Sequence, residues 1–301
     1  MKLLLKRRIQ TVLWFANRRF AAPPPQKNNF EYCRQLVRTR DFENYLCLLL
    51  LSGEPRNIGM VVRAFNVELS QIVDSTSETR TAEMRLEFWK KSIDETFKGR
   101  PPSHPVMISL ALSLEQKMLS KKHFDKLISI RERHIHQRPF MSIADVEDYG
   151  EYSVSPIFDL LLESTCNDSL DALNASSHIG KASSLVALIR GVPYFMTQRK
   201  VLLPTELCVK HSVSQEDILR NRSKDGIKEI IFDVASQANI NLQHVKTMKH
   251  SLEKDLKKLF LQTVPIESFL KHLQRIDFNI FDSKLNQKDW TLPFKLLFHR
   301  K

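Results

Sequence analysis

Two polar residues, Ser70 and Asp74, lie four positions apart in the segment ELSQIVDSTSE. On a helix this spacing places both side chains on one side, opposite an apolar stripe of Ile58, Phe65 and Leu69. Two carboxylates at this spacing could hold a divalent cation that bridges to a diphosphate. Only the second position carries a carboxylate. A solvated helix face is therefore an alternative interpretation of the pair.

Other kinds of catalytic chemistry find little support in the sequence. His134 and His136 are two apart, which directs them to different sides of a helix, and the sequence contains no HExxH motif. It also has neither GxGxxG nor GxxxxGK, the signatures of dinucleotide and phosphate-binding loops. No nucleophile motif surrounds a Ser, Cys or His. We therefore predict no catalytic residue, no metal and no cofactor.

The elements that carry these residues have the periodicity of helices, and no run of alternating polarity predicts a strand. With only 7 glycines, the chain is also poor in the turns that hairpins use. We expect an all-α, single-domain bundle over residues 27–301 with roughly ten helices, and we expect Pro193 to kink or end its helix. The main predicted helices span residues 56–74, 82–97, 106–138, 142–149, 156–163, 179–190 and 225–260, with a shorter one from Pro265 to Leu273.

The first 26 residues have the composition of a targeting sequence. Residues 1–27 hold seven basic side chains among apolar ones and no acid, which is typical of a mitochondrial presequence over residues 1–26. A basic arm on a cytosolic protein is the alternative. The net charge is +12, and without these seven residues 39 basic and 34 acidic side chains leave only +5. Nucleic-acid binding is therefore not expected.

Two further features concern the compartment and the membrane. The four cysteines form no CxxC pair, so we expect free, buried thiols in a reducing compartment. The longest apolar run, Leu46 to Leu51, is far shorter than the ~20 residues that span a bilayer, so any membrane association is expected to be peripheral. The C-terminal stretch favours either a membrane interface or hydrophobic partner, or simple docking onto the bundle. It mixes the aromatic residues Phe278, Phe281, Trp290, Phe294 and Phe298 with the basic residues Lys295, Arg300 and Lys301.

Three segments, SQIVDSTSE, EMRLEFWKKSID and LIRGVPYFMTQRKVLLP, resemble the squalene/phytoene synthase family. The resemblance implies an all-α isoprenoid-synthase fold with a central cavity. It also implies two DxxxD motifs on facing helices that hold magnesium and a prenyl diphosphate. The first motif corresponds to Ser70 and Asp74, and the second to Gly191 and Phe195. Three of the four carboxylates are absent, so the resemblance leads us to expect a pseudoenzyme.

Two later segments, EIIFDVASQANINLQHVK and TVPIESFLKHLQRIDFNIFDSKLNQKDWTLPFKLL, are similar to the branch of that family that assists assembly of mitochondrial respiratory complex I. The resemblance implies a non-catalytic assembly factor that acts early, with the ND1-containing membrane-arm module and other assembly factors as partners. It also implies a peripheral position on the matrix side of the inner membrane. The alternatives are a transferase that uses prenyl diphosphates, or a lipid-binding protein with a degenerate Asp-rich site.

Four basic residues, Arg63, Arg190, Arg199 and Lys200, are expected around the degenerate site. Such side chains could hold an anionic lipid headgroup in the cavity without metal. Alternatively, they pair with Asp74, Glu68 or Glu83 and stabilise the closed bundle.

Overall fold

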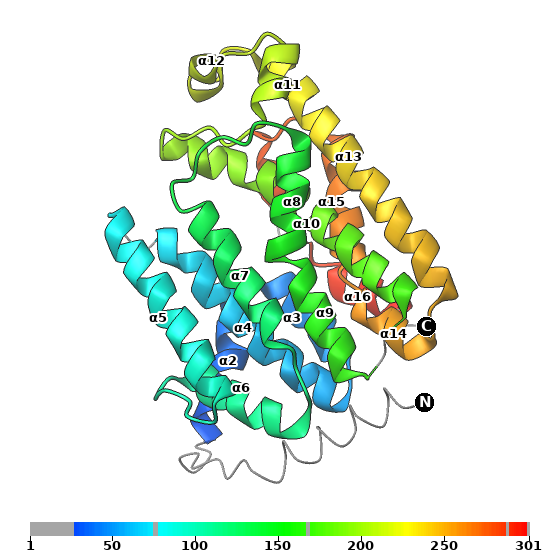
Figure 1. The fold of residues 1–301 in the computed structure, drawn as a ribbon. Coiled ribbons are helices and arrows are strands. Elements are labelled where there is room, and N and C mark those ends of the chain that lie inside the picture. Colours follow the sequence, from blue (N-terminus) through cyan, green and yellow to red (C-terminus); the bar gives the residue numbers. More distant parts are fainter. Residues whose placement is uncertain (1–26, 75–77, 167–168, 287–288, 300–301) are drawn as a thin grey trace.

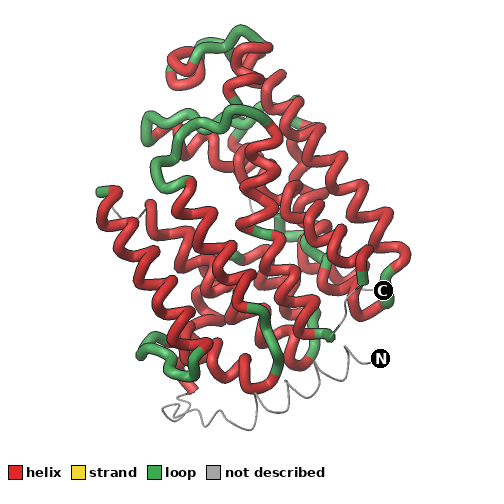
Figure 2. Tube along the Cα trace, in the orientation of Figure 1, coloured by secondary structure: helices red, strands yellow, loops and turns green. Residues whose placement is uncertain are grey.

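The computed structural model describes residues 27–74, 78–166, 169–286 and 289–299, and all of its regular elements are helices (Figures 1 and 2). This confirms the all-α fold class. The predicted presequence, residues 1–26, lies outside the described residues. The α-helices are α2 (Lys27–Arg40), α3 (Phe42–Leu49), α4 (Gly53–Asp74), α5 (Thr79–Phe97), α6 (Pro105–Gln116), α7 (Lys121–Arg133), α8 (Ile143–Ser153), α9 (Ser155–Ser164), α10 (Leu170–Thr197), α11 (Thr205–Lys210), α12 (Gln215–Leu219), α13 (Lys224–Ser251), α14 (Lys254–Leu259), α15 (Thr263–Arg275) and α16 (Leu292–His299), with a 3-10 helix, η1, at Ser283–Asn286.

Helix α10 is the central element of the bundle. It packs against α8, α9, α13 and α15 (Figure 1). Its buried side chains are mostly small or apolar and come from successive turns, as with Ala175, Ile179, Ala182 and Leu185. A helix that is apolar on most sides must be covered on most sides. This is why the segment around residues 179–190 lies in the middle of the fold.

Two glycines set a close approach between α8 and α10. A Cβ atom on Gly150 would lie 2.4 Å from the carbonyl oxygen of Gly180, and a Cβ atom on Gly180 would lie 2.1 Å from Ser155 Oγ. The adjacent Ser184 donates a hydrogen bond to the carbonyl oxygen of Val146, at 2.8 Å. The two backbones therefore come together with no room for a side chain, and this fixes the distance between α8 and α10.

Two predicted long helices are each broken in the structure. The expected helix over residues 106–138 divides into α6 and α7, and the expected helix over residues 225–260 divides into α13 and α14. Each break contains an extended residue, Lys117 in the first and Leu252 in the second. Each also brings a leucine into the core, since Leu119 and Leu252 are buried. Burial of the leucine stabilises the fold more than the helical hydrogen bonds that are lost at the break. The periodicity of the local sequence does not show this gain, because it depends on the neighbouring helices.

Pro193 does not end its helix, because α10 runs through Pro193 to Thr197. That part of the prediction is wrong. A proline deprives a helix of one hydrogen bond, here the bond to the carbonyl of Ile189. Val192 beside it is buried, so tertiary packing holds this last turn in place. The chain then turns at Gln198 and Arg199.

The four cysteines are free, as predicted, but they are not all buried. Cys33, Cys47 and Cys208 are buried, whereas Cys166 is exposed just after α9. Burial raises the pKa of the Cys47 thiol to about 12, so this side chain is an inert part of the core.

Candidate functional site

A cavity of about 330 Å³ lies between α4, α7, α8 and α10, and exposed residues such as Ser70 and Arg138 line part of it. It contains one position from each degenerate motif, Ser70 on α4 and Phe195 on α10. The cavity expected from the sequence resemblance is therefore present. Its lining comprises Asn66, Leu69, Ser70, Arg131, His134, Gln137, Arg138, Phe140, Val146, Tyr149, Ser153, Val154, Ser183, Ser184, Ala187, Leu188, Phe195 and Leu202.

The first motif lies on the last two turns of α4. Ser70 lines the cavity, and its hydroxyl donates a hydrogen bond to the carbonyl oxygen of Val67 at 2.8 Å. The hydroxyl is thus turned back onto its own helix. Asp74 is the last residue of α4, and its side chain lies outside the described part of the chain.

The second motif is filled by an aromatic ring. Phe195 is half-buried and lies one turn after Gly191 on α10. A Cβ atom on Gly191 would lie 2.8 Å from Phe195 Cε2 and 3.2 Å from Cδ2, so the ring covers the glycine. Magnesium requires oxygen ligands in a near-octahedral arrangement, and a phenyl ring offers none. These two positions therefore supply no magnesium ligand from their side chains.

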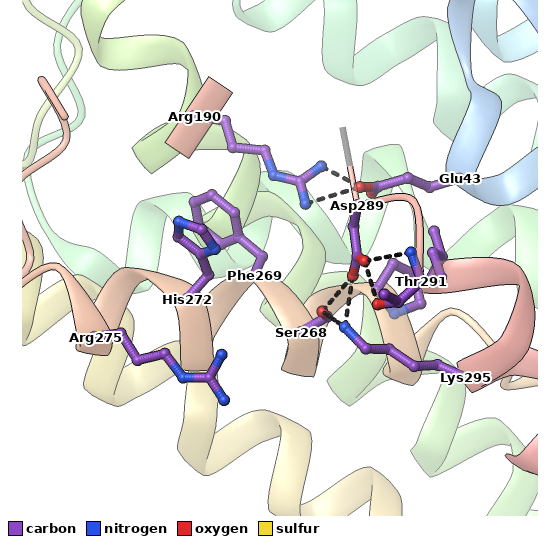
Figure 3. A pocket seen from close by; sticks show the side chains of 11 residues that line it. Glu43, Arg190, Ser268, Phe269, His272, Arg275, Asp289, Thr291 and Lys295 are labelled. Atoms are coloured by element: carbon purple, nitrogen blue, oxygen red, sulfur yellow. Dashed lines mark hydrogen bonds and ion pairs between the residues drawn. The ribbon is translucent and has the colours of Figure 1, made fainter. Parts of the chain in front are cut away.

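Two of the four basic residues that sequence reasoning assigned to this site point elsewhere. Arg63 is only 4% exposed, and its guanidinium pairs with Asp41 at 3.1 Å and donates to Gln262 Oε1 at 3.2 Å. Arg190 makes two hydrogen bonds to Glu43, of 2.8 and 3.2 Å (Figure 3). Neither residue lines the cavity. Arg63 thus ties α4 to the residue before α3, and Arg190 ties α10 to α3.

The other two basic residues follow the end of α10. Arg199 and Lys200 are exposed, and Arg199 adopts a left-handed backbone conformation with φ of 54°. The ammonium group of Lys200 donates a hydrogen bond to Gln137 Oε1. Because Gln137 lines the cavity, Lys200 lies at its rim. The structure therefore brings together Ser70, Phe195 and Lys200, and not the whole predicted group.

The buried cation of the cavity is Arg131, which sequence reasoning missed. It is 7% exposed and donates to the backbone oxygen of Leu127 at 2.8 Å and to Asn66 Oδ1 at 2.5 Å. Neither partner carries a charge. The Nε of Arg131 has no hydrogen-bond partner within the described part of the chain. Burial lowers the pKa of Arg131, with an opposing contribution from Tyr149. A signal was present, because the helical period of Phe124 and Leu127 places Arg131 on the buried face of α7.

Aromatic rings form one part of the cavity wall. The His134 ring lies 5.0 Å from that of Tyr149 and 5.4 Å from that of Phe140, measured between centroids. Burial, and next to it the charge of Arg133, lower the pKa of His134 and favour the neutral imidazole. Among the described residues that line the cavity, none is Asp or Glu. This arrangement suits an apolar group with a single anionic end better than a hydrated metal ion.

Metal ligands do not gather elsewhere in the described ranges either, since no three His, Cys, Asp or Glu side chains there are placed to hold an ion. One of the buried polar residues outside the cavity is His123 on α7. It lies 3.3 Å from Asp159 and 3.3 Å from Glu163, both on α9. The contact with Asp159 is an ion pair rather than a well-aligned hydrogen bond. This cluster joins α7 to α9.

Comparison with known proteins supports these assignments at two levels. The squalene/phytoene synthase family profile matches residues 37–293. Among solved structures, a dehydrosqualene synthase in complex with ligand superimposes with a TM-score of 0.78 at 15% identity, covering 91% of this chain and 96% of the other. A squalene synthase from Alicyclobacillus acidocaldarius superimposes with a TM-score of 0.74 at 19% identity, covering 84% and 95%. At such identities the likeness shows the fold.

Curated relatives are closer in sequence. Proteins named NADH dehydrogenase (ubiquinone) complex I, assembly factor 6 are 40% identical in Homo sapiens, over 92% of this chain and 83% of the relative, and 38% identical in Bos taurus, over 97% and 92%. A homolog from Drosophila melanogaster is 36% identical over 90% of this chain and 83% of its own length. On this evidence of fold and sequence, the chain belongs to the squalene/phytoene synthase family, and within it to the group of its complex I assembly factor 6 relatives.

Proposed function

We propose that this protein is a non-catalytic assembly factor for mitochondrial respiratory complex I. The names of its relatives support the assembly role. The observation that carries the non-catalytic part is the replacement of three motif carboxylates by Ser70, Gly191 and Phe195, with the Phe195 ring covering the glycine. The protein is thus proposed to keep the architecture of a prenyl-transferring enzyme as a scaffold.

The chemistry of diphosphate departure explains why the missing carboxylates matter. Ionisation of a prenyl diphosphate leaves a pyrophosphate whose charge must be neutralised, normally by metal ions that carboxylates organise. Asp74 is the one carboxylate left in the motif frame. A single carboxylate is a poor site for Mg²⁺, which dehydrates reluctantly and needs fixed octahedral oxygen ligands. Arg131 supplies one positive charge in the cavity, which does not replace several divalent ions.

The finer assignments are part of the same proposal. We place the protein on the matrix side of the inner membrane as a peripheral protein, acting early with the ND1-containing membrane-arm module and other assembly factors. The acid-free, Arg-rich N-terminal sequence supports import into mitochondria. Within the described residues, no helix has both the length and the apolar character needed to cross a bilayer.

Depletion and rescue test the assembly role. Cells that lack the protein are expected to lose mature complex I while the other respiratory complexes persist, and the wild-type chain should restore it. A chain with Phe195→Ala should restore it too, because the side chain is proposed to have no catalytic role. Normal complex I levels after complete depletion would refute the proposal.

A turnover assay tests the non-catalytic part. The purified chain is incubated with farnesyl or geranylgeranyl diphosphate and Mg²⁺, and products are identified by mass spectrometry. We expect no head-to-head condensation product and no Mg²⁺-dependent binding of pyrophosphate. Detection of either would favour the alternative, a prenyl-diphosphate-using transferase with unusual ligands.

A second candidate function, binding of a lipid in the cavity, is favoured by Arg131. A guanidinium that is buried among apolar and aromatic side chains, and that has no carboxylate partner among the described side chains, is suited to an anionic headgroup. Mass spectrometry of small molecules that co-purify with the chain should then detect a polyprenyl or phospholipid species. Arg131→Met should remove it and leave the melting temperature unchanged or higher, because a buried charge is removed. If the same species is retained by Arg131→Met, the cavity is not its site.

A further inference from the structure

Helix α16 is apolar on both of its faces. Leu292 and Leu296 are buried in a small cluster with Cys47, Leu261 and Val264, which docks the helix onto the bundle. The opposite face projects into solvent, where Phe294, Leu297 and Phe298 are 65%, 51% and 78% exposed. Trp290, just before the helix, is 81% exposed. We call these four exposed side chains the aromatic patch.

The position of the patch is fixed by hydrogen bonds at the start of α16. The Asp289 carboxylate accepts hydrogen bonds from the Thr291 backbone N–H at 3.0 Å, from Ser268 at 2.7 Å and from Lys295 at 2.7 Å (Figure 3). Although burial opposes ionisation, these donors hold the pKa of Asp289 well below its usual range. Ser268 belongs to α15, so this group ties the start of α16 to the bundle. These hydrogen bonds therefore fix the position of the aromatic patch relative to α15.

A cation without a salt bridge among the described residues, Arg275, lines a pocket next to the start of α16. A pocket of about 220 Å³ adjoins the start of α16 and is lined by His272, Arg275 and Lys295, among others (Figure 3). Its two acids are engaged, Glu43 by Arg190 and Asp289 by Lys295. Arg275 is exposed and forms no salt bridge among the described residues, and His272 Nε2 is buried without a hydrogen-bond partner there. The lining of the pocket holds Arg190, Arg275 and Lys295 against Glu43 and Asp289, so its described side chains carry one net positive charge.

We propose that the aromatic patch and the adjoining basic pocket form the surface by which this protein lies on a membrane containing anionic phospholipids. The inference rests on the peripheral membrane association proposed above and names the surface responsible. Exposed aromatic side chains with flanking basic residues have the composition of an interfacial segment, since rings settle at the headgroup level and cations attract anionic lipid. The sequence continues with two more cations, Arg300 and Lys301.

The extent of the patch favours a membrane over a protein partner. An aromatic side chain buries roughly 150–250 Å² when fully covered, so the three partly exposed rings and Leu297 offer on the order of 500 Å². A stable protein interface buries about 800 Å² on each partner. A small convex helix face falls short of that area. It is sufficient to enter the headgroup region of a bilayer, where the basic pocket adds electrostatic attraction.

Trp290 gives a direct readout of this surface. The chain has 3 tryptophans, Trp14, Trp89 and Trp290, and Trp89 is buried. The full chain with Trp14→Phe is mixed with phosphatidylcholine–phosphatidylglycerol vesicles whose acyl chains carry bromine near the headgroup. We expect the Trp290 emission to shift to the blue and to be quenched. A chain that also carries Trp290→Phe should show no quenching of the remaining Trp89.

Vesicle sedimentation tests the contribution of each part. Phe294→Ser with Phe298→Ser should lower partitioning at least ~10-fold, because both rings leave the interface. Met84→Ser with Leu170→Ser is the matched control, since these side chains are 66% and 71% exposed on other helices, and it should bind like the wild type. Arg275→Gln, higher salt or vesicles of phosphatidylcholine alone should each weaken binding.

The outcomes separate this inference from the proposal on which it rests. If the protein sediments with vesicles but Trp290 stays in water, the membrane association stands and the aromatic patch is the wrong surface. If the protein does not bind vesicles under any condition, the membrane association itself fails. If Trp290 becomes buried with rising protein concentration and no lipid, a second copy of the chain covers the patch, and the inference is overturned.

Discussion

Replacement of Arg63 by alanine should lower the stability of the fold and leave the cavity unaffected. The ion pair that it forms with Asp41 is largely buried, with 5% of the Arg63 side chain and 21% of the Asp41 side chain exposed. Breaking a buried pair costs about 3–5 kcal/mol, mainly because one charge stays behind without its partner. Asp41 keeps some contact with water, so the lower end of that range applies.

A second contact adds to this loss. The Arg63 guanidinium lies 5.7 Å from the centroid of the Phe158 ring, and such a cation–π contact contributes about 0.5–2 kcal/mol. We therefore expect Arg63→Ala to reduce the free energy of unfolding by about 3.5–5 kcal/mol. Arg190→Ala is the comparison, because its pair with Glu43 is 39% and 38% exposed. Solvent-exposed pairs of this kind contribute about 1 kcal/mol or less. The Arg190 guanidinium also lies 4.4 Å from the centroid of the Phe269 ring, so we expect Arg190→Ala to cost about 1–2 kcal/mol in all.

Urea unfolding followed by far-ultraviolet circular dichroism measures both losses. A double-mutant cycle with Asp41→Ala should then return a coupling free energy of about 1–3 kcal/mol for the Arg63 pair. The reasoning is refuted if Arg63→Ala costs no more than Arg190→Ala. It is also refuted if Arg63→Ala leaves stability unchanged but removes a co-purifying lipid, since Arg63 would then act in the cavity.

Three further predictions concern contacts within the bundle. Burial opposes the charged imidazolium of His123, but its two carboxylate partners outweigh this effect and raise its pKa. The contribution of His123 to stability is therefore complete below the unfolded pKa of about 6.5 and is lost as the pH rises through the folded pKa. His123→Gln should flatten this decline of stability when unfolding is measured across pH. Gly150→Ala should cost about 1–3 kcal/mol or more, because its Cβ meets the Gly180 backbone 2.4 Å away; an unchanged melting temperature would show that α8 can move aside. In a Phe195→Ala background, Gly191→Ala should stabilise the chain by about 1 kcal/mol, because alanine has the higher helix propensity. In the wild type the gain should be smaller, because the Phe195 ring must shift to make room for the Cβ atom. Equal effects in the two backgrounds would mean that the ring does not cover the glycine.

Much of the fold could be predicted from local pattern. The stripe of Ile58, Phe65 and Leu69 is fully buried on α4, as the 3.6-residue period requires. The breaks between α6 and α7 and between α13 and α14 could not be predicted, because a buried leucine at each break stabilises the bundle only when its neighbours are in place. Continuation of α10 through Pro193 has the same origin, since packing compensates for one lost hydrogen bond.

Some features of the candidate site could also be predicted from the sequence, and others depend on the tertiary structure. The sequence by itself determined that three motif carboxylates are absent, because residue identity needs no geometry. It could not determine where long charged side chains point, since an arginine can reach several partners around its helix. Only the tertiary structure directed Arg63 and Arg190 to Asp41 and Glu43, and left Arg131 as the buried cation of the cavity. The helical period of α7 indicates that Arg131 is buried, but the choice of ion-pair partner depends on elements far apart in the chain, which a local sequence pattern does not contain.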